Sequence, residues 1–386
     1  MEEALKGDEI FSDVLAEAFL TECPATPLSH LAEGSEGLAA EGVPYQVSAY
    51  VTRACNLRCL HCYISADKPL PDELSYEEWS RAFSELVDLG TRVLYILGGE
   101  PMLRRDIYDI ISSASGLGMK VSMSTNGTLI GKREAVRLRE SGLSEVQVSL
   151  DGPSEAINDS IRPPGSFRAA ISAIRHLKEV GLRVTIGVTL FSANEAYVKS
   201  MIDLAKNLGV DSITFEALAP FGRAIVNRLQ RPSENIWRTI LPLAAGSPRI
   251  SLSSMRFLMP ISLLQESYRK AKELLGKSSY QTCPAGRSRM VIDANGDVYG
   301  CELLIGLMKP EGNVRRDSIK ELWRGGFGGL RRRDLSNVLP CSSCTMYELC
   351  RGGCPARALQ RYRTLRAPDP MCPYVKGRPV PSASRL

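Results

Sequence analysis

Along residues 46–215, short runs of β-branched, aromatic and other apolar residues alternate with longer segments in which apolar residues recur every three or four positions. The first pattern is typical of buried strands and the second of amphipathic helices. This alternation predicts parallel strands joined by helical crossovers. The predicted strands are 47–52, 92–97, 120–124, 145–150, 183–190 and 212–215. The predicted helices are 76–89, 105–117, 132–141, 166–180 and 194–208.

The predicted helices carry recognisable ends. Ser75 precedes the first helix and Glu78 follows three residues later, which is the arrangement of a capping box. A glycine follows each helix, where left-handed backbone commonly ends it. These glycines are Gly90, Gly118, Gly142, Gly181 and Gly209.

Polar, glycine-rich or cysteine-rich loops follow the first four predicted strands. Parallel α/β proteins collect their reactive groups at this end of their strands. We therefore expect these loops to form one site. Beyond the cysteine loop that follows the first strand, the loop residues are Gly98, Gly99, Glu100, Pro101, Ser124, Asn126, Ser149 and Asp151.

The pattern divides the chain into four segments. Residues 1–45 predict a short acidic helix, around 10–21, and a Pro/Gly/Ser-rich linker. Residues 46–230 hold the strand–helix repeats, and residues 231–282 form a helical linker with a helix near 234–245. Residues 283–386 lose the periodicity and are rich in Gly, Arg and Cys, so metals would have to staple this segment.

The composition is that of an ordinary globular protein, with 44% hydrophobic and 24% charged residues among 386. No apolar run approaches the roughly 18–20 residues that cross a bilayer. The chain starts with acidic residues and lacks the basic region and apolar core of a signal peptide. We therefore expect a cytoplasmic protein with no membrane partner.

Cys55, Cys59 and Cys62 lie together on the loop after the first predicted strand. Eleven cysteines in a cytoplasmic chain favour metal ligation over disulfides. Three thiolates on one loop can hold three irons of a [4Fe–4S] cubane and leave the fourth iron open for chemistry. Zinc is the alternative, but it normally needs a fourth Cys or His nearby, and His61 is wedged between the ligands.

The spacing Cys-x3-Cys-x2-Cys resembles the hallmark of the radical S-adenosylmethionine (SAM) superfamily. The resemblance implies that the open iron binds SAM, whose reductive cleavage yields a 5′-deoxyadenosyl radical that takes hydrogen from a substrate. It also implies an α/β fold built as a partial (βα)6 TIM-like barrel with a C-terminal cysteine-rich iron–sulfur domain. His61 occupies the position that usually helps to seat the adenine, and it either has that role or is a spacer with an exposed ring.

The loop after the second strand resembles the Gly-Gly-Glu motif of this superfamily. The resemblance implies that Gly98 and Gly99 let the backbone approach SAM closely, with Pro101 completing the turn. It also implies that the Glu100 carboxylate accepts a hydrogen bond from the SAM ammonium group.

The next strand ends complete the implied SAM site. The resemblance places Ser124 and Asn126 at the SAM carboxylate and ribose, and Ser149 and Asp151 over the same mouth. Asn-Gly and Asp-Gly are also favoured turn pairs without any ligand.

Three further residues are candidates around this mouth. Arg162 either reaches the SAM carboxylate or pairs with a helix end. Val188 is expected to pack on the adenine, and Glu216, which follows the sixth strand, is the candidate catalytic residue through a substrate contact.

Seven cysteines between residues 283 and 372 form a second set. Residues 290–301 predict a β-hairpin with an Asn295-Gly296 turn. All seven cysteine spacings resemble the SPASM extension of some radical SAM enzymes, which carries two auxiliary [4Fe–4S] clusters. By position, one cluster takes Cys283, Cys301 and Cys354, and the other takes Cys341, Cys344, Cys350 and Cys372.

The first auxiliary cluster is expected to have incomplete cysteine ligation. Some family members have another cysteine a few residues before the position of Cys283, and this chain has none there. An open iron, a non-cysteine ligand or a different cluster form remain alternatives. Zinc at Cys341 to Cys354 is a further alternative, because Cys-x2-Cys pairs also bind zinc.

Charge is uneven along the chain. Residues 1–43 hold ten Asp and Glu against one Lys, and residues 309–386 hold sixteen Lys and Arg against six Asp and Glu. The basic end either offsets the charge of thiolate-bound clusters or receives an acidic electron donor or a carboxylate-rich substrate. Nucleic acid is not favoured, because the basic residues are not interleaved with aromatics.

We predict a radical SAM oxidoreductase that works with a low-potential donor such as flavodoxin or ferredoxin. Its substrate is expected to be a small molecule of the tetrapyrrole or heme-biosynthesis kind. A peptide substrate, as for a maturase, is the alternative, although residues 1–45 are too few for a separate recognition domain. A non-catalytic iron–sulfur or zinc-binding module is the alternative of another class, and the Gly-Gly-Glu and Ser-Thr-Asn-Gly loops argue against it.

Overall fold

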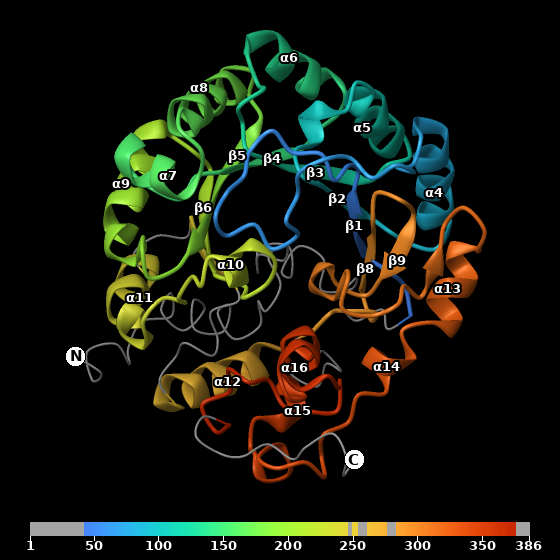
Figure 1. Cartoon of the computed structure of the whole chain (residues 1–386), viewed down its shortest axis with the longest axis vertical. Coiled ribbons are helices and arrows are strands. Elements are labelled where there is room, and N and C mark those ends of the chain that lie inside the picture. Colours follow the sequence, from blue (N-terminus) through green and yellow to red (C-terminus); the bar gives the residue numbers. More distant parts are fainter. Residues whose placement is uncertain (1–41, 246–248, 254–260, 276–282, 376–386) are drawn as a thin grey trace.

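The computed structural model describes residues 42–245, 249–253, 261–275 and 283–375 (Figure 1). The predicted N-terminal helix and Cys23 lie outside these residues. The described chain folds around one sheet of ten strands in the order β10-β9-β8-β1-β2-β3-β4-β5-β6-β7.

Eight strands of this sheet, from β8 through β1 to β7, run parallel, and β9 and β10 pair antiparallel beyond β8. The six strands predicted from the sequence are β1–β6, so the open barrel of α/β units is confirmed. The strands are β1 (Gln46–Tyr50), β2 (Val93–Leu97), β3 (Lys120–Thr125), β4 (Glu145–Ser149), β5 (Arg183–Leu190), β6 (Ser212–Ala217), β7 (Ile250–Ser253), β8 (Arg289–Ile292), β9 (Asp297–Tyr299) and β10 (Gly312–Asn313).

Helices form an outer ring around the parallel strands (Figure 1). The predicted helices that fall within the described residues are present, with ends that shift by at most two residues except at 194–208 and near 234–245, where a short 3-10 turn precedes each helix. The helices are α4 (Tyr76–Asp88), α5 (Ile107–Gly116), α6 (Lys132–Glu140), α7 (Glu155–Ile161), α8 (Ser166–Glu179), α9 (Val198–Leu208), α10 (Arg223–Val226), α11 (Trp237–Ala245) and α12 (Ile261–Leu275).

The predicted helix ends are also present. Ser75 and Glu78 form the full capping box at the start of α4. All five predicted terminal glycines have positive φ, which a glycine adopts without the steric cost that a Cβ would bring.

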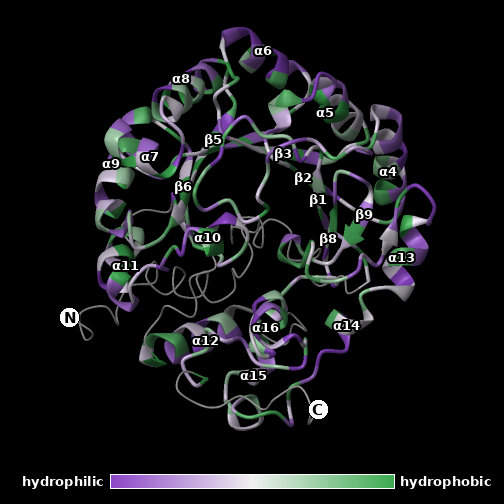
Figure 2. Ribbon diagram, in the orientation of Figure 1, coloured by the Kyte–Doolittle hydropathy of each residue, from purple (hydrophilic) through white to green (hydrophobic). Residues whose placement is uncertain are grey.

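Each outer helix is amphipathic, and Figure 2 shows both apolar and polar residues on these helices. In α4, the buried side chains are Trp79, Ala82, Phe83 and Leu86, spaced for one helical face. Strand side chains alternate in the same way: in β2, Leu94 and Ile96 are fully buried, whereas Tyr95 and Leu97 line a cavity inside the barrel. The outer layer is therefore an apolar core, and the interior is left for a ligand.

Four strands extend the sheet beyond β1–β6, namely β7 at one end and β8, β9 and β10 at the other. β7 adds to β6, and β8, from the cysteine-rich segment, adds to the free edge of β1. The predicted hairpin is present as β8 and β9, with its turn at Asp293–Gly296. Its pairing with β1 was not predicted, because partners more than 200 residues apart leave no trace in a local pattern.

The C-terminal segment is built from short helices held by arginines: α13 (Ile319–Gly325), α14 (Gly328–Arg331), α15 (Tyr347–Cys350) and α16 (Pro355–Tyr362). The Arg333 guanidinium donates to the carbonyls of Arg351, Gly352, Gly353, Leu365 and Ala367. Arg357 pairs with the fully buried Asp369 at 2.6 Å. These charged side chains hold the loops of the segment together, beside apolar residues such as Trp323 and Phe327 that belong to the main core.

Candidate active site

The loop after β1 places Cys55, Cys59 and Cys62 on the wall of one cavity of about 1080 Å³ at the carboxyl ends of the strands. We call it the loop cavity. Two backbone hydrogen bonds tie the base of this loop to the end of β2, from Gly99 N to Thr52 O and from Glu100 N to Ala54 O, each 2.8 Å long. The three thiols therefore share a cavity that is closed on one side by the Gly-Gly-Glu turn.

Gly98 and Gly99 serve this close contact. A Cβ at Gly99 would lie 2.0 Å from the Ala54 carbonyl oxygen, and one at Gly98 would lie 2.6 Å from the Thr52 carbonyl oxygen. No other residue fits there without moving the cysteine loop. Both glycines also line the loop cavity, so the backbone is exposed to a ligand as well.

Glu100 is fully buried and orders the neighbouring strand end. Its carboxylate accepts hydrogen bonds from the Thr125 hydroxyl and the Asn126 backbone amide, both at 2.7 Å, and from Met102 N at 3.1 Å. Pro101 follows at the start of a 3-10 turn, Pro101–Leu103. Glu100 is not among the residues that line the loop cavity, so in this structure it supports the wall.

The predicted SAM-contacting residues Ser124, Asn126 and Ser149 line the loop cavity, as does Val188. The Asn126 side chain donates to Asn56 Oδ1 at 2.9 Å, which joins the end of β3 to the cysteine loop. The structure thus brings these strand ends to the face on which the cysteines lie.

Asp151, His61 and Arg162 form a buried charged cluster. Asp151 Oδ2 lies 2.6 Å from both His61 Nε2 and Arg162 Nε, and its Oδ1 accepts from Thr189 N at 2.8 Å. Burial alone would raise the pKa of Asp151, but Arg162 and His61 hold it well below its usual range. His61 and Arg162 line the loop cavity and Asp151 stands behind them. The His61 side chain is only 9% exposed, so it is not a spacer with a free ring.

Burial favours the protonated form of two thiols of this loop, Cys55 and Cys59, in the absence of metal. Burial raises the pKa of Cys55 to about 11 and also raises that of Cys59, although Arg162 opposes the second shift. Arg162 Nη1 lies 3.8 Å from Cys59 Sγ. Metal binding must displace these protons, and the guanidinium offers a positive charge to the thiolates that result.

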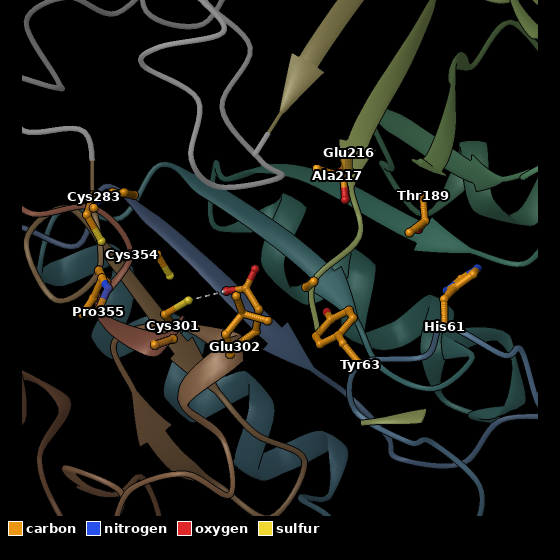
Figure 3. A pocket seen from close by; sticks show the side chains of 16 residues that line it. His61, Tyr63, Thr189, Glu216, Ala217, Cys283, Cys301, Glu302, Cys354 and Pro355 are labelled. Atoms are coloured by element: carbon orange, nitrogen blue, oxygen red, sulfur yellow. Dashed lines mark hydrogen bonds between the residues drawn. The ribbon is translucent and has the colours of Figure 1, made fainter. Parts of the chain in front are cut away.

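A second cavity of about 870 Å³, the central cavity, connects the barrel to the C-terminal segment. Cys283, Cys301 and Cys354 lie on one side of it, and Glu216, Thr189, His61, Tyr63 and Glu302 line the rest (Figure 3). The last five residues also line the loop cavity. The two sets of three cysteines therefore face a common space between them.

Glu216, the next-to-last residue of β6, lines this common space. Its Oε1 is buried and has no hydrogen-bond partner among the described residues. Burial raises its pKa to about 8, and the negative charge of Glu302 contributes, so the side chain is mostly protonated at neutral pH. A buried carboxyl group without a partner is a strong candidate for contact with a substrate.

Cys341, Cys344, Cys350 and Cys372 line a third cavity of about 310 Å³, the outer cavity, with Tyr347 and Tyr374 on its wall. In the part of the chain that the structure describes, no three His, Cys, Asp or Glu side chains are arranged to hold a single metal ion. The thiols instead surround cavities in sets of three, three and four, a donor chemistry that fits iron–sulfur clusters.

The sequence reasoning missed several residues of the common space. Tyr63, whose hydroxyl is hydrogen-bonded to that of the buried Tyr50, follows Cys62 directly. Gln147 lies two residues before Ser149, so the alternation of β4 points both into the cavity. Glu302 follows Cys301, and its partner Arg289 lies on β8. Two signals in the sequence could have identified these residues: a position directly after a cysteine, and the alternation of side chains along a strand.

Within the described ranges, no helix combines the length and the apolar character that a membrane span requires.

Comparison with known proteins agrees with this site. The radical SAM superfamily model matches residues 49–205, and the SPASM iron–sulfur cluster-binding model matches residues 283–354. The chain is 30% identical to the AdoMet-dependent heme synthase of Oleidesulfovibrio alaskensis, over 87% of this chain and 88% of that protein. It is 31% identical to the mycofactocin maturase MftC of Mycobacterium tuberculosis, over 93% of this chain and 90% of that protein.

A solved structure shares the fold. Streptococcus suis SuiB bound to S-adenosylmethionine superposes with a TM-score of 0.72 at 19% identity, over 89% of this chain and 80% of that one. The two family models and the sequence relatives show an enzyme with SAM-binding and [4Fe–4S] chemistry. This chain belongs to the radical SAM superfamily and carries a C-terminal SPASM domain.

Proposed function

We propose that the enzyme oxidises a substrate held in the space between the loop cavity and the central cavity. The observation that carries this proposal is the shared lining: His61, Tyr63, Thr189, Glu216 and Glu302 border both cavities. A molecule placed there faces the first cysteine set on one side and the set at Cys283, Cys301 and Cys354 on the other.

The residues of the loop cavity have distinct proposed roles. Cys55, Cys59 and Cys62 would hold a [4Fe–4S] cluster with an open iron, which together with SAM supplies a 5′-deoxyadenosyl radical. Ser124, Asn126, Ser149 and the Gly98-Gly99 backbone line the space that SAM would occupy. Arg162 offers its guanidinium to the SAM carboxylate while Asp151 fixes its orientation from behind.

The C-terminal cysteines would hold two auxiliary clusters. Cys283, Cys301 and Cys354 border the substrate space, so a cluster there is placed to exchange an electron with the substrate. The four cysteines of the outer cavity would hold a second cluster. A low-potential protein such as flavodoxin or ferredoxin is the proposed reductant.

For the substrate, we favour a carboxylate-bearing small molecule of the tetrapyrrole kind. A relative is named as a heme synthase. Arg223 lines the loop cavity, donates to the carbonyls of Cys59 and Ala66, and forms no ion pair with a described residue. Its positive charge is therefore available to a substrate carboxylate.

Peptide modification is the second candidate. A relative of similar identity is named as a mycofactocin maturase. A groove with a volume of about 1120 Å³, lined by residues of α10 and of the 302–307 loop, is also bordered by Tyr63 and Glu302. Ile225 and Val226, at 53% and 77% exposure, are exposed apolar side chains of α10, and Ile225 lines this groove, as would suit an extended chain.

The test is anaerobic reconstitution followed by SAM cleavage. The purified enzyme should bind about twelve irons per chain, three cubanes, and form 5′-deoxyadenosine with dithionite and SAM. Turnover should rise with an iron porphyrin that carries propionate groups and not with short peptides, and Cys59→Ala should abolish both basal and stimulated cleavage. Stimulation by peptides alone would move the substrate assignment to the second candidate, and no cleavage under any condition would refute the enzymatic proposal.

A further inference from the structure

In the part of the chain that the structure describes, the central cavity has one thiol too few for a fully cysteine-ligated cubane. A [4Fe–4S] cluster has four irons, each of which takes one protein ligand in the ordinary case. Among the described residues that line this cavity, the cysteines are Cys283, Cys301 and Cys354. The other described cysteines line the loop cavity and the outer cavity.

Glu302 places a carboxylate oxygen beside these thiols. It directly follows Cys301 and begins the short 3-10 helix Glu302–Leu304. Its residue exposure is 4%, and its Oε2 lies 3.5 Å from Cys301 Sγ, the contact drawn as a dashed line in Figure 3. A buried carboxylate is costly unless a partner or a metal compensates its charge.

The other oxygen of Glu302 is held in place. Its Oε1 accepts from Arg289 Nη2 at 3.0 Å, and the same nitrogen donates to Ser48 Oγ at 3.0 Å. Both partners of this ion pair are nearly inaccessible, with side chains 2% and 3% exposed. One carboxylate oxygen is thus anchored to the barrel strands β1 and β8, while the other faces the cysteine set.

We propose that Glu302 Oε2 is the fourth protein ligand of the cluster bound by Cys283, Cys301 and Cys354. This inference rests on the proposed auxiliary cluster in the central cavity. A ligating carboxylate commonly has its second oxygen hydrogen-bonded to the surrounding protein, and Arg289 supplies that contact. The bond forms by coordination of an anionic carboxylate to iron, so it requires no change of oxidation state.

The ligation has a consequence for the substrate space. Glu302 also lines the loop cavity and the surface groove. The oxygen-ligated iron would therefore be the one nearest to the substrate. Because carboxylate is a harder and less tightly held ligand for such an iron than thiolate, this corner of the cluster is the one at which a substrate group could displace the protein.

The experiment uses full-length protein with Cys55→Ala, Cys59→Ala and Cys62→Ala, so that only the auxiliary clusters remain. This parent is reconstituted with ⁵⁷Fe and studied by Mössbauer spectroscopy, and by electron paramagnetic resonance after reduction, with and without cyanide. We expect about eight irons per chain, which corresponds to two cubanes. One of these irons should give the distinct Mössbauer doublet of an oxygen-ligated site. Cyanide should leave the parent spectrum unchanged or displace the carboxylate only at high concentration.

Glu302→Gln in this background should remove the distinct doublet and let cyanide bind at least tenfold more tightly. Glu216→Gln is the matched control, because it removes the other carboxyl group of the same cavity and should leave both spectra as in the parent. Cys23→Ser is a second control, because Cys23 is the one cysteine of the sequence not assigned to a cluster, and it should also leave the spectra unchanged if Glu302 is the fourth ligand.

Three outcomes would overturn the inference. If the parent holds eight irons with only sulfur ligation, and Cys23→Ser loses this complete sulfur ligation, the fourth ligand is the Cys23 thiol. Equal cyanide affinity in the parent and in Glu302→Gln would indicate an open iron. About four irons in the parent, with the same iron content after Cys283→Ala, would show that no cluster is bound at Cys283, Cys301 and Cys354. That outcome would refute this part of the proposed function, whereas the first two outcomes leave the proposed function intact. Because an open iron should bind cyanide readily in the parent itself, the parent spectra with and without cyanide test the proposal even where a variant folds poorly.

Discussion

Asp151 connects several parts of the site, although it is not among the described residues that line the loop cavity or the central cavity. It orients His61 and Arg162, whose side chains face the loop cavity, and it receives the backbone amide of Thr189. Its charge is what makes a buried guanidinium near Cys59 tolerable. A residue of this kind is a positioning residue, and its effects should appear in stability before they appear in chemistry.

Asp151→Asn should lower the free energy of unfolding by about 3 kcal/mol, because it leaves the Arg162 charge buried without its partner. Anaerobic denaturant titration of protein with matched iron content measures this. Glu155→Gln is the control, since Glu155 pairs with an arginine that is 78% exposed. That change should cost under about 1 kcal/mol, and equal effects of the two substitutions would contradict the buried-charge argument.

Glu216 should make stability depend on pH in a direction opposite to that of an ordinary carboxylate. Its pKa is raised from 4.5 to about 8, so in this window the folded protein retains a proton that the unfolded chain releases. The stability that Glu216 contributes is present below about pH 4.5 and is lost as the pH rises through 8.

Glu216→Gln cannot ionise and should escape this loss. From pH 5 to pH 9, the free energy of unfolding of the variant should therefore rise by about 1–3 kcal/mol relative to that of the unsubstituted protein. Denaturant titrations of both proteins at several pH values provide the measurement. A difference that stays constant with pH would show that Glu216 titrates normally.

The Gly-Gly-Glu turn after β2 and the cysteine loop after β1 approach so closely that a Cβ at Gly99 would overlap a backbone oxygen. Since that oxygen belongs to Ala54, next to Cys55, any relief of the overlap must move the first cluster ligand.

Gly99→Ala should thus reduce iron binding by up to about four irons per chain, one cubane, and abolish SAM cleavage. The helical Gly116→Ala is the control, because nothing lies within 4 Å of its added methyl group. That change should leave the iron content as it was and stabilise the protein slightly. Full iron content in Gly99→Ala would mean that the cysteine loop tolerates displacement.

Elements were largely predictable where the information is local. The strands β1–β6 and the helices between them follow from alternation, from the Ser75–Glu78 cap and from glycines with positive φ. The loops at the carboxyl ends of the strands followed from topology. What escaped prediction depends on distant partners: the pairing of β8 with β1, the Arg289–Glu302 ion pair and the inward position of Tyr63.

In the molecule as a whole, the barrel and the C-terminal segment depend on different forces. The barrel is built mainly on an apolar core, whereas residues 328–375 combine a few core residues, such as Leu330 and Leu349, with arginine contacts and thiols. Without metal, the thiols of Cys341 and Cys372 favour the protonated form, since burial raises the pKa of each to about 12. Metal binding should therefore contribute much of the local stability.

Replacing Cys344 and Cys372 with Ser should remove about four irons, one cubane, and make residues 328–375 sensitive to protease. Limited proteolysis with mass spectrometry, under anaerobic conditions, measures this. Ser342→Ala, beside Cys341 on an exposed turn, is the control and should behave as the parent. Unchanged cleavage in the double variant would show that arginine contacts suffice.

The parallel pairing of β8 with β1 also affects how the chain folds while it is being synthesised. During synthesis, β1 finds β2 within about fifty residues, but its other edge has no described neighbour until residues 289–292 emerge. An unpaired edge is a template for association with other chains. A nascent chain that stalls before residue 289 should consequently be the form most in need of a chaperone, even though all residues of the loop cavity but Arg289 and Glu302 have by then been made.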